Sequence, residues 1–354
     1  MKKITVRASK TYDIVIGFNL LDHLEEYLRP VMKGDTALIV TDDRVGPLYL
    51  ERLKEALAAM GLRVLEHVIP HGEVSKSPEE YFRLVTAMAD GGLTRRDTVF
   101  ALGGGVVGDL AGFAAATYMR GVGFVQVPTT LLAAVDSSVG GKTGIDLPQG
   151  KNLAGAFYQP DAVICDLQLL DTLPEDVFTD GMAEVIKYAF IADSPLLVLL
   201  QNPIERPLLE DIVALCVSIK RDIVEIDERE GGARRLLNFG HTVGHAIETC
   251  SGYAVSHGRA VAAGMAVITR ASVQAGYCPP AVSETLEALL RRHGLPTTAP
   301  YTARELSQAA LSDKKRAGDA LSLVLPETFG RCRVLEMSTK GFESFLAPAL
   351  GEIR

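Results

Sequence analysis

The sequence predicts an α/β fold in which an N-terminal domain built on a mainly parallel sheet is followed by a mainly α-helical C-terminal domain. Up to about residue 170, short β-branched runs alternate with amphipathic helical segments, an order typical of a parallel sheet covered by helices. Beyond about residue 172, helical periodicity dominates. A length of 354 residues fits two domains of about 150 residues each, which we place at 1–171 and 172–354.

The expected elements follow one another along the chain. Strands are predicted at 37–41 (ALIVT), 98–102 (TVFAL), 123–127 (GFVQV) and 162–166 (AVICD). A helix at 77–91 carries Ser77 as its cap, Pro78 in its first turn, Glu80 to complete a capping box and Gly91 as its terminator. Further helices are predicted at 175–192, 207–229, 240–250, 258–275, 282–293 and 303–313, with strand-like runs at 321–325 and 331–336.

Composition excludes several classes of protein. The chain is 47% hydrophobic, and its formal net charge of −8 argues against a nucleic-acid partner. Its five cysteines are scattered without a C-x-x-C pair, which favours a reducing compartment over a disulfide framework. No apolar run approaches 18 residues, and the alternating start lacks the apolar core of a signal peptide. We therefore expect a soluble, cytoplasmic protein with no membrane partner.

A glycine-rich turn indicates a dinucleotide site. GGGVVG at 103–108 satisfies G-x-G-x-x-G between a predicted strand and a predicted helix, the context that the motif requires. Glycines let backbone amides approach a pyrophosphate, and the N-terminus of the helix favours negative charge. The acid expected about twenty residues later is missing, because Pro128 stands there; Asp42, after the strand 37–41, is an alternative. A Rossmann-like domain is favoured over a plain tight turn.

A second glycine-rich segment presents lysines. DSSVGGKTGID ends in GKT, but the first glycine of a P-loop would have to stand at Asp136, whose carboxylate would repel a phosphate. What remains is a turn that presents Lys142, followed by Lys151 and Asn152 in GKNLAG. An anion site and a solvated loop both remain open for these residues.

Three of the seven histidines lie within seventeen positions. HTVGHAIE places His241 and His245 on one helical face, and His257 follows in AVSHGRAV. A catalytic zinc site uses three protein ligands and one open position. The candidate carboxylate is Glu184 in GMAEVIKY, although a glutamate with Lys187 one turn later is ordinarily a surface ion pair. Spacing alone does not say which two histidines would bind a metal and which one would serve the substrate.

Taken together, these segments resemble the 3-dehydroquinate synthases of the shikimate pathway, members of the sugar-phosphate cyclase superfamily. The matching runs keep the order of that family and cover most of the chain from 71 to 265. They are HGEVSKS (71–77), ALGGGVVGDLAGFAAATYMRG (101–121), QVPTTLLAAVDSSVGGKTGID (126–146), GKNLAGAFYQP (150–160), TLPEDVFTDGMAEVIKY (172–188), DEREGGARRLLNFGHTVGHAIE (227–248) and HGRAVAAGM (257–265). DKKRAGD (313–319) continues the likeness weakly, while the first seventy residues and the tail are generic.

The resemblance implies a phosphate-eliminating carbon–oxygen lyase that uses NAD and a divalent metal. It would convert 3-deoxy-D-arabino-heptulosonate 7-phosphate to 3-dehydroquinate and phosphate by transient oxidation, phosphate elimination, reduction, ring opening and an intramolecular aldol step. NAD would bind in the N-terminal domain, and zinc, with cobalt as a substitute, between the domains. The expected partners are this small anionic sugar phosphate and a second copy of the chain in a homodimer.

The resemblance also assigns individual residues. Its zinc ligands fall on Glu184, His241 and His257, which leaves His245 for substrate or proton handling. The NAD-binding positions fall on Asp42, Glu73, Lys76, Gly105, Val106, Val107, Gly108, Asp109, Thr129, Thr130, Asp136, Lys142 and Lys151. The substrate-binding positions fall on Arg120, Lys142, Asn152, Lys187, Lys220, Arg234, Asn238, His245 and either Lys314 or Lys315.

One departure and three rivals remain. Arg259 stands where family members often have glutamate, so it either changes the electrostatics beside His257 or faces away. Other sugar-phosphate cyclases would share the cofactor sites. The resemblance favours the dehydroquinate branch over them on four residues, Lys142, Lys151, Asn152 and Arg234. A polyol dehydrogenase would produce NADH on balance. A catalytically silent NAD or metal sensor is disfavoured because every polar position expected for turnover is filled.

Overall fold

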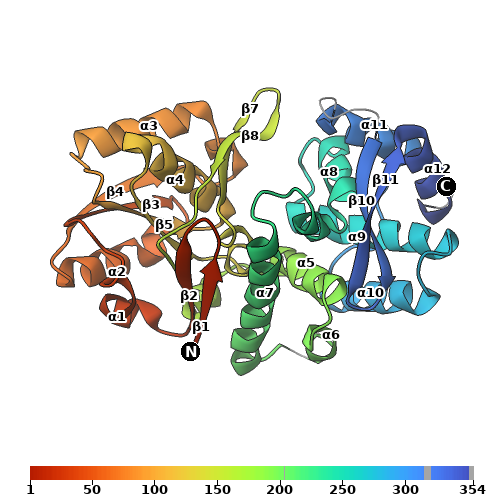
Figure 1. The fold of residues 1–354 in the computed structure, drawn as a ribbon, viewed down its shortest axis with the longest axis horizontal. Helices are drawn as coiled ribbons and strands as arrows, with labels where there is room; N and C mark the ends of the chain where they lie inside the picture. The colour runs from red at the N-terminus through yellow and green to blue at the C-terminus, as the bar shows by residue number, and fades with distance from the viewer. Residues whose placement is uncertain (203, 315–319, 351–354) are drawn as a thin grey trace. The chain divides into compact units, whose positions relative to one another are not determined.

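The computed structural model describes residues 1–202, 204–314 and 320–350, except for the side chains of 312–314. The chain divides into two compact units (Figure 1). The first comprises Met1–Pro174 together with Arg206–Glu228, and the second comprises Glu175–Glu205 together with Arg229–Arg354.

The first unit is built on a seven-stranded sheet with the order β1-β2-β9-β6-β5-β3-β4. Only β1 and β2 pair antiparallel; the remaining neighbours are parallel. The strands are β1 (Lys2–Arg7), β2 (Thr11–Gly17), β3 (Thr36–Asp42), β4 (Arg63–Ile69), β5 (Thr98–Gly103), β6 (Gly123–Pro128) and β9 (Ala162–Asp166). The four predicted strands are confirmed as β3, β5, β6 and β9.

Helices cover both faces of this sheet (Figure 1). Side chains of β3 alternate between the faces, so that Ile39 packs in the core with α1 (Leu24–Leu28) and α2 (Gly46–Ala59). Leu38 packs in the opposite core with α3 (Pro78–Asp90) and α4 (Gly105–Thr117).

The predicted cap of α3 is confirmed in part. The Ser77 hydroxyl accepts a hydrogen bond from the Glu80 amide at 3.2 Å. The Glu80 carboxylate does not complete the capping box. It contacts His67 at 3.2 Å and Arg83 at 2.9 Å instead.

The division into units differs from the single cut expected after residue 171. Helix α7 (Arg206–Ile226) groups with the first unit, because it packs on β1, β2 and the short π-helix η4 (Ala133–Ser137). The Glu225 carboxylate accepts a hydrogen bond from the Arg7 amide at 2.6 Å, and that of Glu228 accepts one from the Ser9 amide at 2.8 Å. The chain therefore leaves the α/β unit and returns to it once.

The segment expected as a glycine-rich turn is a hairpin of β7 (Lys142–Leu147) and β8 (Gly150–Phe157). Its glycines permit close approach of the two strands. A Cβ atom on Gly155 would lie 2.2 Å from the Thr143 carbonyl oxygen. Glycine here reflects strand packing, which the sequence pattern alone does not distinguish from a turn.

The second unit is mainly helical, as predicted. Its helices are α5 (Glu175–Ile191), α6 (Leu196–Leu199), α8 (His241–Cys250), α9 (His257–Gln274), α10 (Pro280–Arg292), α11 (Ala303–Lys314) and α12 (Thr339–Leu350). Helix α9 is buried along most of its length and packs on α5, α8, α10 and α12 (Figure 1). The predicted strands are confirmed as the hairpin β10 (Ala320–Thr328) and β11 (Arg331–Ser338). Within the described ranges, no helix combines the length and apolarity that crossing a bilayer requires.

Candidate active site

The carboxyl ends of three parallel strands meet at one edge of the first unit's sheet. Strand β3 ends at Asp42, β5 at Gly103 and β6 at Pro128, and β5 pairs with both of the others. The connection order reverses here, because β4 follows β3 on one side while β5 lies on the other. Parallel α/β sheets bind ligands at such a switch point, outside the carboxyl ends of the strands.

The glycine motif occupies this edge. Strand β5 passes through Gly104 directly into α4, so the predicted strand–turn–helix context is confirmed. A Cβ atom on Gly108 would lie 2.8 Å from Oε1 of Gln126, which shows that this glycine permits close packing of helix on strand. Val107 is fully buried in the core, and thus only its backbone can serve a nucleotide. The Thr129 amide donates to the Gly103 carbonyl at 3.0 Å, and Thr130 Oγ1 accepts from the Ala133 amide at 3.1 Å.

Two adjacent carboxylates follow β3 at the same edge. Oδ1 of Asp42 accepts from the amides of Arg44 and Val45 at 2.9 and 2.8 Å, so this side chain shapes the entry to α2. Asp43 contacts Nδ1 of His71 at 2.7 Å and also accepts from the His71 amide at 3.0 Å. These contacts with His71 lower the pKa of Asp43. Sequence reasoning proposed Asp42 and missed Asp43.

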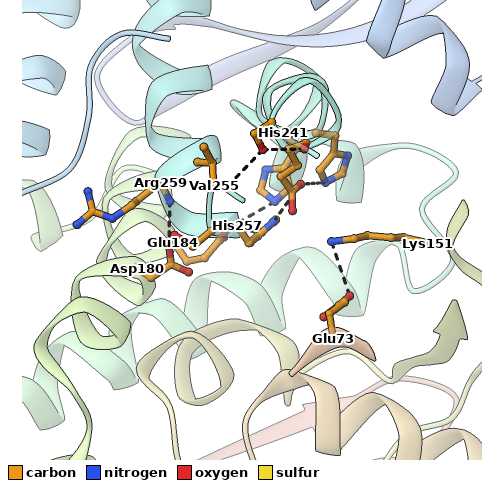
Figure 2. A network of polar contacts seen from close by, with 12 residues as sticks. Glu73, Lys151, Asp180, Glu184, His241, Val255, His257 and Arg259 are labelled. Carbon is orange, nitrogen blue, oxygen red and sulfur yellow. Dashed lines mark hydrogen bonds and ion pairs between the residues drawn. The ribbon is translucent and has the colours of Figure 1, made fainter. Parts of the chain in front are cut away.

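A buried lysine gathers several predicted residues. Nζ of Lys76, 5% exposed, lies 2.8 Å from Asp109, 2.5 Å from Oδ1 of Asn152 and 3.7 Å from Glu73. Glu73 also lies 3.8 Å from Nζ of Lys151 (Figure 2). Burial lowers the pKa of Lys76, but the carboxylates of Asp109 and Glu73 raise it by more. The two segments HGEVSKS and GKNLAG therefore meet in one charged group.

Other predicted residues of the first unit differ in their contacts and exposure. Nζ of Lys220 contacts the Asp136 side chain at 3.0 Å and its carbonyl at 2.7 Å, which links α7 to η4. Lys142 is exposed at the start of β7. Arg120 is exposed, and its φ of 66° lies in the left-handed region, as does the φ of 54° at Asn152. Such backbone is costly for a residue with a side chain and is concentrated at functional sites.

In the second unit, three side chains form a cluster with the dimensions of a metal site. Oε1 of Glu184 lies 3.5 Å from Nε2 of His241 and 3.5 Å from Nε2 of His257. Tetrahedral ligands at zinc–ligand distances of about 2.0–2.2 Å stand about 3.3–3.6 Å apart, so these residues fit the ion. The centre of the His245 ring lies 5.6 Å from that of His241 and 6.0 Å from that of His257.

The surroundings of His241 and His257 shift the pKa of each imidazole. Nδ1 of His241 lies 3.2 Å from the Phe239 carbonyl, which leaves Nε2 toward Glu184, and burial lowers the pKa of this histidine to about 3. Burial also lowers the pKa of His257, but the carboxylates of Glu184 and Glu248 raise it to about 10. Positive charge between the two carboxylates is therefore favourable, whether a proton or a divalent metal supplies it.

Glu184 and Lys187 are not the surface pair that their spacing suggested. Each is 1% exposed, and Nζ of Lys187 contacts Oε2 of Glu184, leaving Oε1 to face the imidazoles. Removing two charges from water costs several kcal/mol per ion unless their surroundings compensate. A helix that bears this cost in its apolar stretch indicates a functional pair.

Backbone packing sets the positions of the histidines. Helices α8 and α9 cross closely, since a Cβ atom on Gly264 would lie 2.2 Å from the Gly240 carbonyl oxygen. Gly240 has a φ of +81° directly before His241, a conformation that favours glycine.

The start of α9 is held from α5 by Asp180. Its Oδ1 accepts from Ser256 Oγ at 2.5 Å and from the Arg259 amide at 3.0 Å. The Arg259 side chain extends away from Glu184 and His257 (Figure 2). Arg259 therefore contacts Asp180 through its backbone amide, and its side chain does not face the cluster.

Comparison with known proteins now assigns the family. The family model described as 3-dehydroquinate synthase N-terminal matches residues 66–180, and the one described as 3-dehydroquinate synthase C-terminal matches 181–316. The chain belongs to the 3-dehydroquinate synthase family. The 3-dehydroquinate synthase of Geobacter metallireducens is 44% identical over 95% of this chain and 96% of its own. That of Desulforamulus reducens is 44% identical over 93% and 94%, respectively.

Solved structures of sugar-phosphate cyclases share the fold. A 2-deoxy-scyllo-inosose synthase, solved with carbaglucose-6-phosphate, NAD+ and Co2+, superposes with a TM-score of 0.89 at 24% identity, covering 98% of this chain and 99% of its own. The 2-epi-5-epi-valiolone synthase of Streptomyces hygroscopicus, solved with NAD+ and Zn2+, has a TM-score of 0.86 at 26% identity over the same shares. An iron-containing alcohol dehydrogenase is more distant, with a TM-score of 0.68 at 15% identity, covering 98% of this chain and 99% of its own.

The structure of this 3-dehydroquinate synthase family member also places the other substrate residues predicted in the second unit. Arg234 is 1% exposed in a short helical turn, and Nδ2 of Asn238 donates to Glu230 at 2.6 Å. His245 is partly exposed. Lys314 ends α11, but its side chain and all of Lys315 lie outside the described residues.

Sequence reasoning missed three acidic residues of the second unit. Glu230 contacts Asn238, Asp180 holds the start of α9, and Glu248 faces His257. All three lie inside the runs that carried the family resemblance. Glu248 becomes buried, and Asp180 on α5 contacts the start of α9, only when the chain is folded. Spacing therefore gave no signal for either.

Proposed function

We propose that this chain acts as a 3-dehydroquinate synthase, converting 3-deoxy-D-arabino-heptulosonate 7-phosphate to 3-dehydroquinate and phosphate with NAD and a divalent metal. The observation that carries the proposal is the buried Glu184, which offers one oxygen to two imidazoles and the other to Lys187. This arrangement joins a metal site to a buried cation suited to an anionic substrate.

The structure supports a division of the cofactors between the units. Glu184, His241 and His257 would hold zinc, or cobalt in its place, and the sheet edge after β3, β5 and β6 would hold NAD. Bound NAD supplies a hydride acceptor that returns its hydride, and the bound metal supplies a Lewis acid that acidifies a substrate hydroxyl.

The chain's own residues then bind and orient the substrate. A sugar phosphate with a carboxylate requires several cations, which Lys142, Lys151 and Lys220 supply in the first unit, and Lys187 and Arg234 in the second. Hydrogen bonds to charged groups contribute roughly 1.5–3 kcal/mol each. Arg120, Asn152 and Asn238 would orient the same anion, and His245 would move a proton beside it.

The deciding experiment measures phosphate release and NADH together. Catalytic amounts of NAD should support many equivalents of phosphate release from the heptulosonate phosphate, without steady growth of NADH absorbance. A chelator should stop the release, and zinc or cobalt should restore it. NADH that accumulates with substrate consumption, without phosphate, would indicate a dehydrogenase. Phosphate release from another sugar phosphate in preference to this one would indicate a different cyclase.

We also propose that the chain works as a homodimer in the cytoplasm. The family resemblance supports the dimer, and the scattered cysteines support a reducing compartment. Light scattering coupled to size-exclusion chromatography should give twice the chain mass of 38.0 kDa, and a mass of one chain would contradict the dimer.

A further inference from the structure

A buried carboxylate lies behind one of the two imidazoles. Glu248 is 5% exposed, and its Oε2 lies 3.7 Å from Nδ1 of His257 and 4.0 Å from Nε2 of His245. Glu184 lies on the opposite side of the same ring, 3.5 Å from Nε2. The His257 ring therefore stands between two buried carboxylates, one at each nitrogen.

The backbone after α8 makes this arrangement possible. The Glu248 carbonyl accepts from the Tyr253 amide and from Ser251 Oγ, both at 2.8 Å. Ser251 Oγ in turn accepts from the Val255 amide at 3.2 Å, and Tyr253 takes a φ of 65°. These contacts fold the chain tightly, so that His257 returns to the helix that carries Glu248.

Each of the two imidazoles has an oxygen atom near its Nδ1, at hydrogen-bond distance for His241 and at ion-pair distance for His257. A metal-bound histidine almost always gives its second ring N–H to a carboxylate, a backbone carbonyl or water, which fixes the tautomer and the orientation of the ring. For His241 the group that can accept this second N–H is the Phe239 carbonyl, 3.2 Å from Nδ1. For His257 the group facing Nδ1 is Glu248.

We propose that Glu248 is a positioning residue of the metal site. It holds His257 with the N–H on Nδ1 and the lone pair of Nε2 directed toward Glu184. This inference rests on the proposed metal site and adds a residue that acts through a ligand without binding the ion itself.

The test measures cobalt binding to the full chain without substrate. Glu248→Gln keeps the size of the side chain and removes its charge. We expect it to bind Co2+ about 10- to 100-fold more weakly in competition with a chelator, with an altered Co2+ visible spectrum. The melting temperature of the metal-free protein should stay near that of the wild type. Glu284→Gln, which removes the same charge from an exposed position on α10, should leave affinity and spectrum unchanged.

Other outcomes would overturn the positioning role of Glu248 or the metal site, or would call for a second variant. Wild-type affinity and spectrum in Glu248→Gln would overturn the proposal, as would an affinity loss that merely parallels a lower melting temperature of the metal-free protein. Wild-type protein that binds no cobalt would overturn the metal site itself. Should Glu248→Gln fail to fold, Glu248→Asp decides, because its charge lies one methylene farther away. An intermediate affinity would support the proposal and wild-type affinity would overturn it.

Discussion

Two regions of the molecule are built in opposite ways: the nucleotide edge of the first unit, where β3, β5 and β6 end, and the metal cluster of the second unit, Glu184, His241 and His257. At the edge, glycines and strand ends present backbone, and most of the predicted side chains there are partly exposed or engaged in local hydrogen bonds. In the cluster, charged side chains are buried on helices that leave little freedom to move. The first arrangement depends on the absence of side-chain atoms, and the second on the exact placement of a few of them.

The difference has an energetic reason. Backbone amides at the start of a helix carry partial positive charge without any ionised group, so an anion site there requires no buried charge. A metal site requires a carboxylate and neutral imidazoles held a few ångströms apart, which is costly until a cation joins them. Substitutions should therefore have their largest effects in the cluster and smaller effects at the edge.

The largest effect is expected for alanine at Glu184, His241 or His257. Each substitution removes one of three proposed ligands, so bound metal should fall from about one ion per chain to near zero, with a loss of activity beyond about 100-fold. Elemental analysis of the folded variants measures the metal. His245→Ala should keep the metal and lose rate. If His245→Ala empties the site while His257→Ala leaves it full, the assignment of the histidines is wrong.

At the nucleotide edge, Gly105→Val should weaken NAD binding about 10- to 100-fold, or about 1.4 to 2.8 kcal/mol. A Cβ atom at this position would lie 3.2 Å from Ser137 Oγ, and the rest of the side chain would obstruct the start of α4. Calorimetric titration with NAD measures the change. Cobalt binding should persist, because the metal cluster belongs entirely to the other unit. Unchanged NAD affinity would reduce the glycine motif to a packing feature.

Lys142→Ala and Lys151→Ala should weaken binding of a non-cleavable phosphonate analogue by about 10-fold each, since these lysines are partly solvated. Their melting temperatures should stay within about 1 °C of the wild type, as expected for surface substitutions. Lys340→Ala, at an exposed position on α12, is the matched control. Unchanged affinity for the analogue in both variants would show that the β7–β8 hairpin is a solvated segment without a role in binding.

The smallest effect is expected for Asp180→Ala, which removes the support of α9. Loss of a helix cap costs about 0.5–2 kcal/mol and should lower the melting temperature by a few degrees, measured by calorimetry. Because α9 begins at His257, cobalt affinity should fall slightly as well. Asp180→Asn keeps a hydrogen-bond acceptor and should recover most of both. A cobalt affinity that falls as far as in the ligand variants would instead place Asp180 in the metal site.

The sequence by itself determined the order of elements and the identity of the chemistry-bearing segments. Buried parallel strands such as β3 and β5 are continuous apolar runs, and α5, α8 and α9 carry helical periodicity, so local pattern was enough to predict them. It did not predict the edge strands β1 and β4, whose half-exposed residues give weaker patterns, nor β2 beside β1, nor the pairing of β7 with β8.

Tertiary structure alone decided which of these segments meet. Asp42 lies more than sixty residues before the glycine motif, and only the pairing of β3 with β5 brings both to one edge. His241 and His245 share a helical face in the sequence, yet the position of Glu184 on α5 selects His241 and His257 as the imidazoles that face it. Glu248 and Asp180 acquire their contacts with the start of α9 only when the helices pack. Periodicity reports what lies on one helix or strand, whereas a site is made of side chains that distant elements bring within a few ångströms.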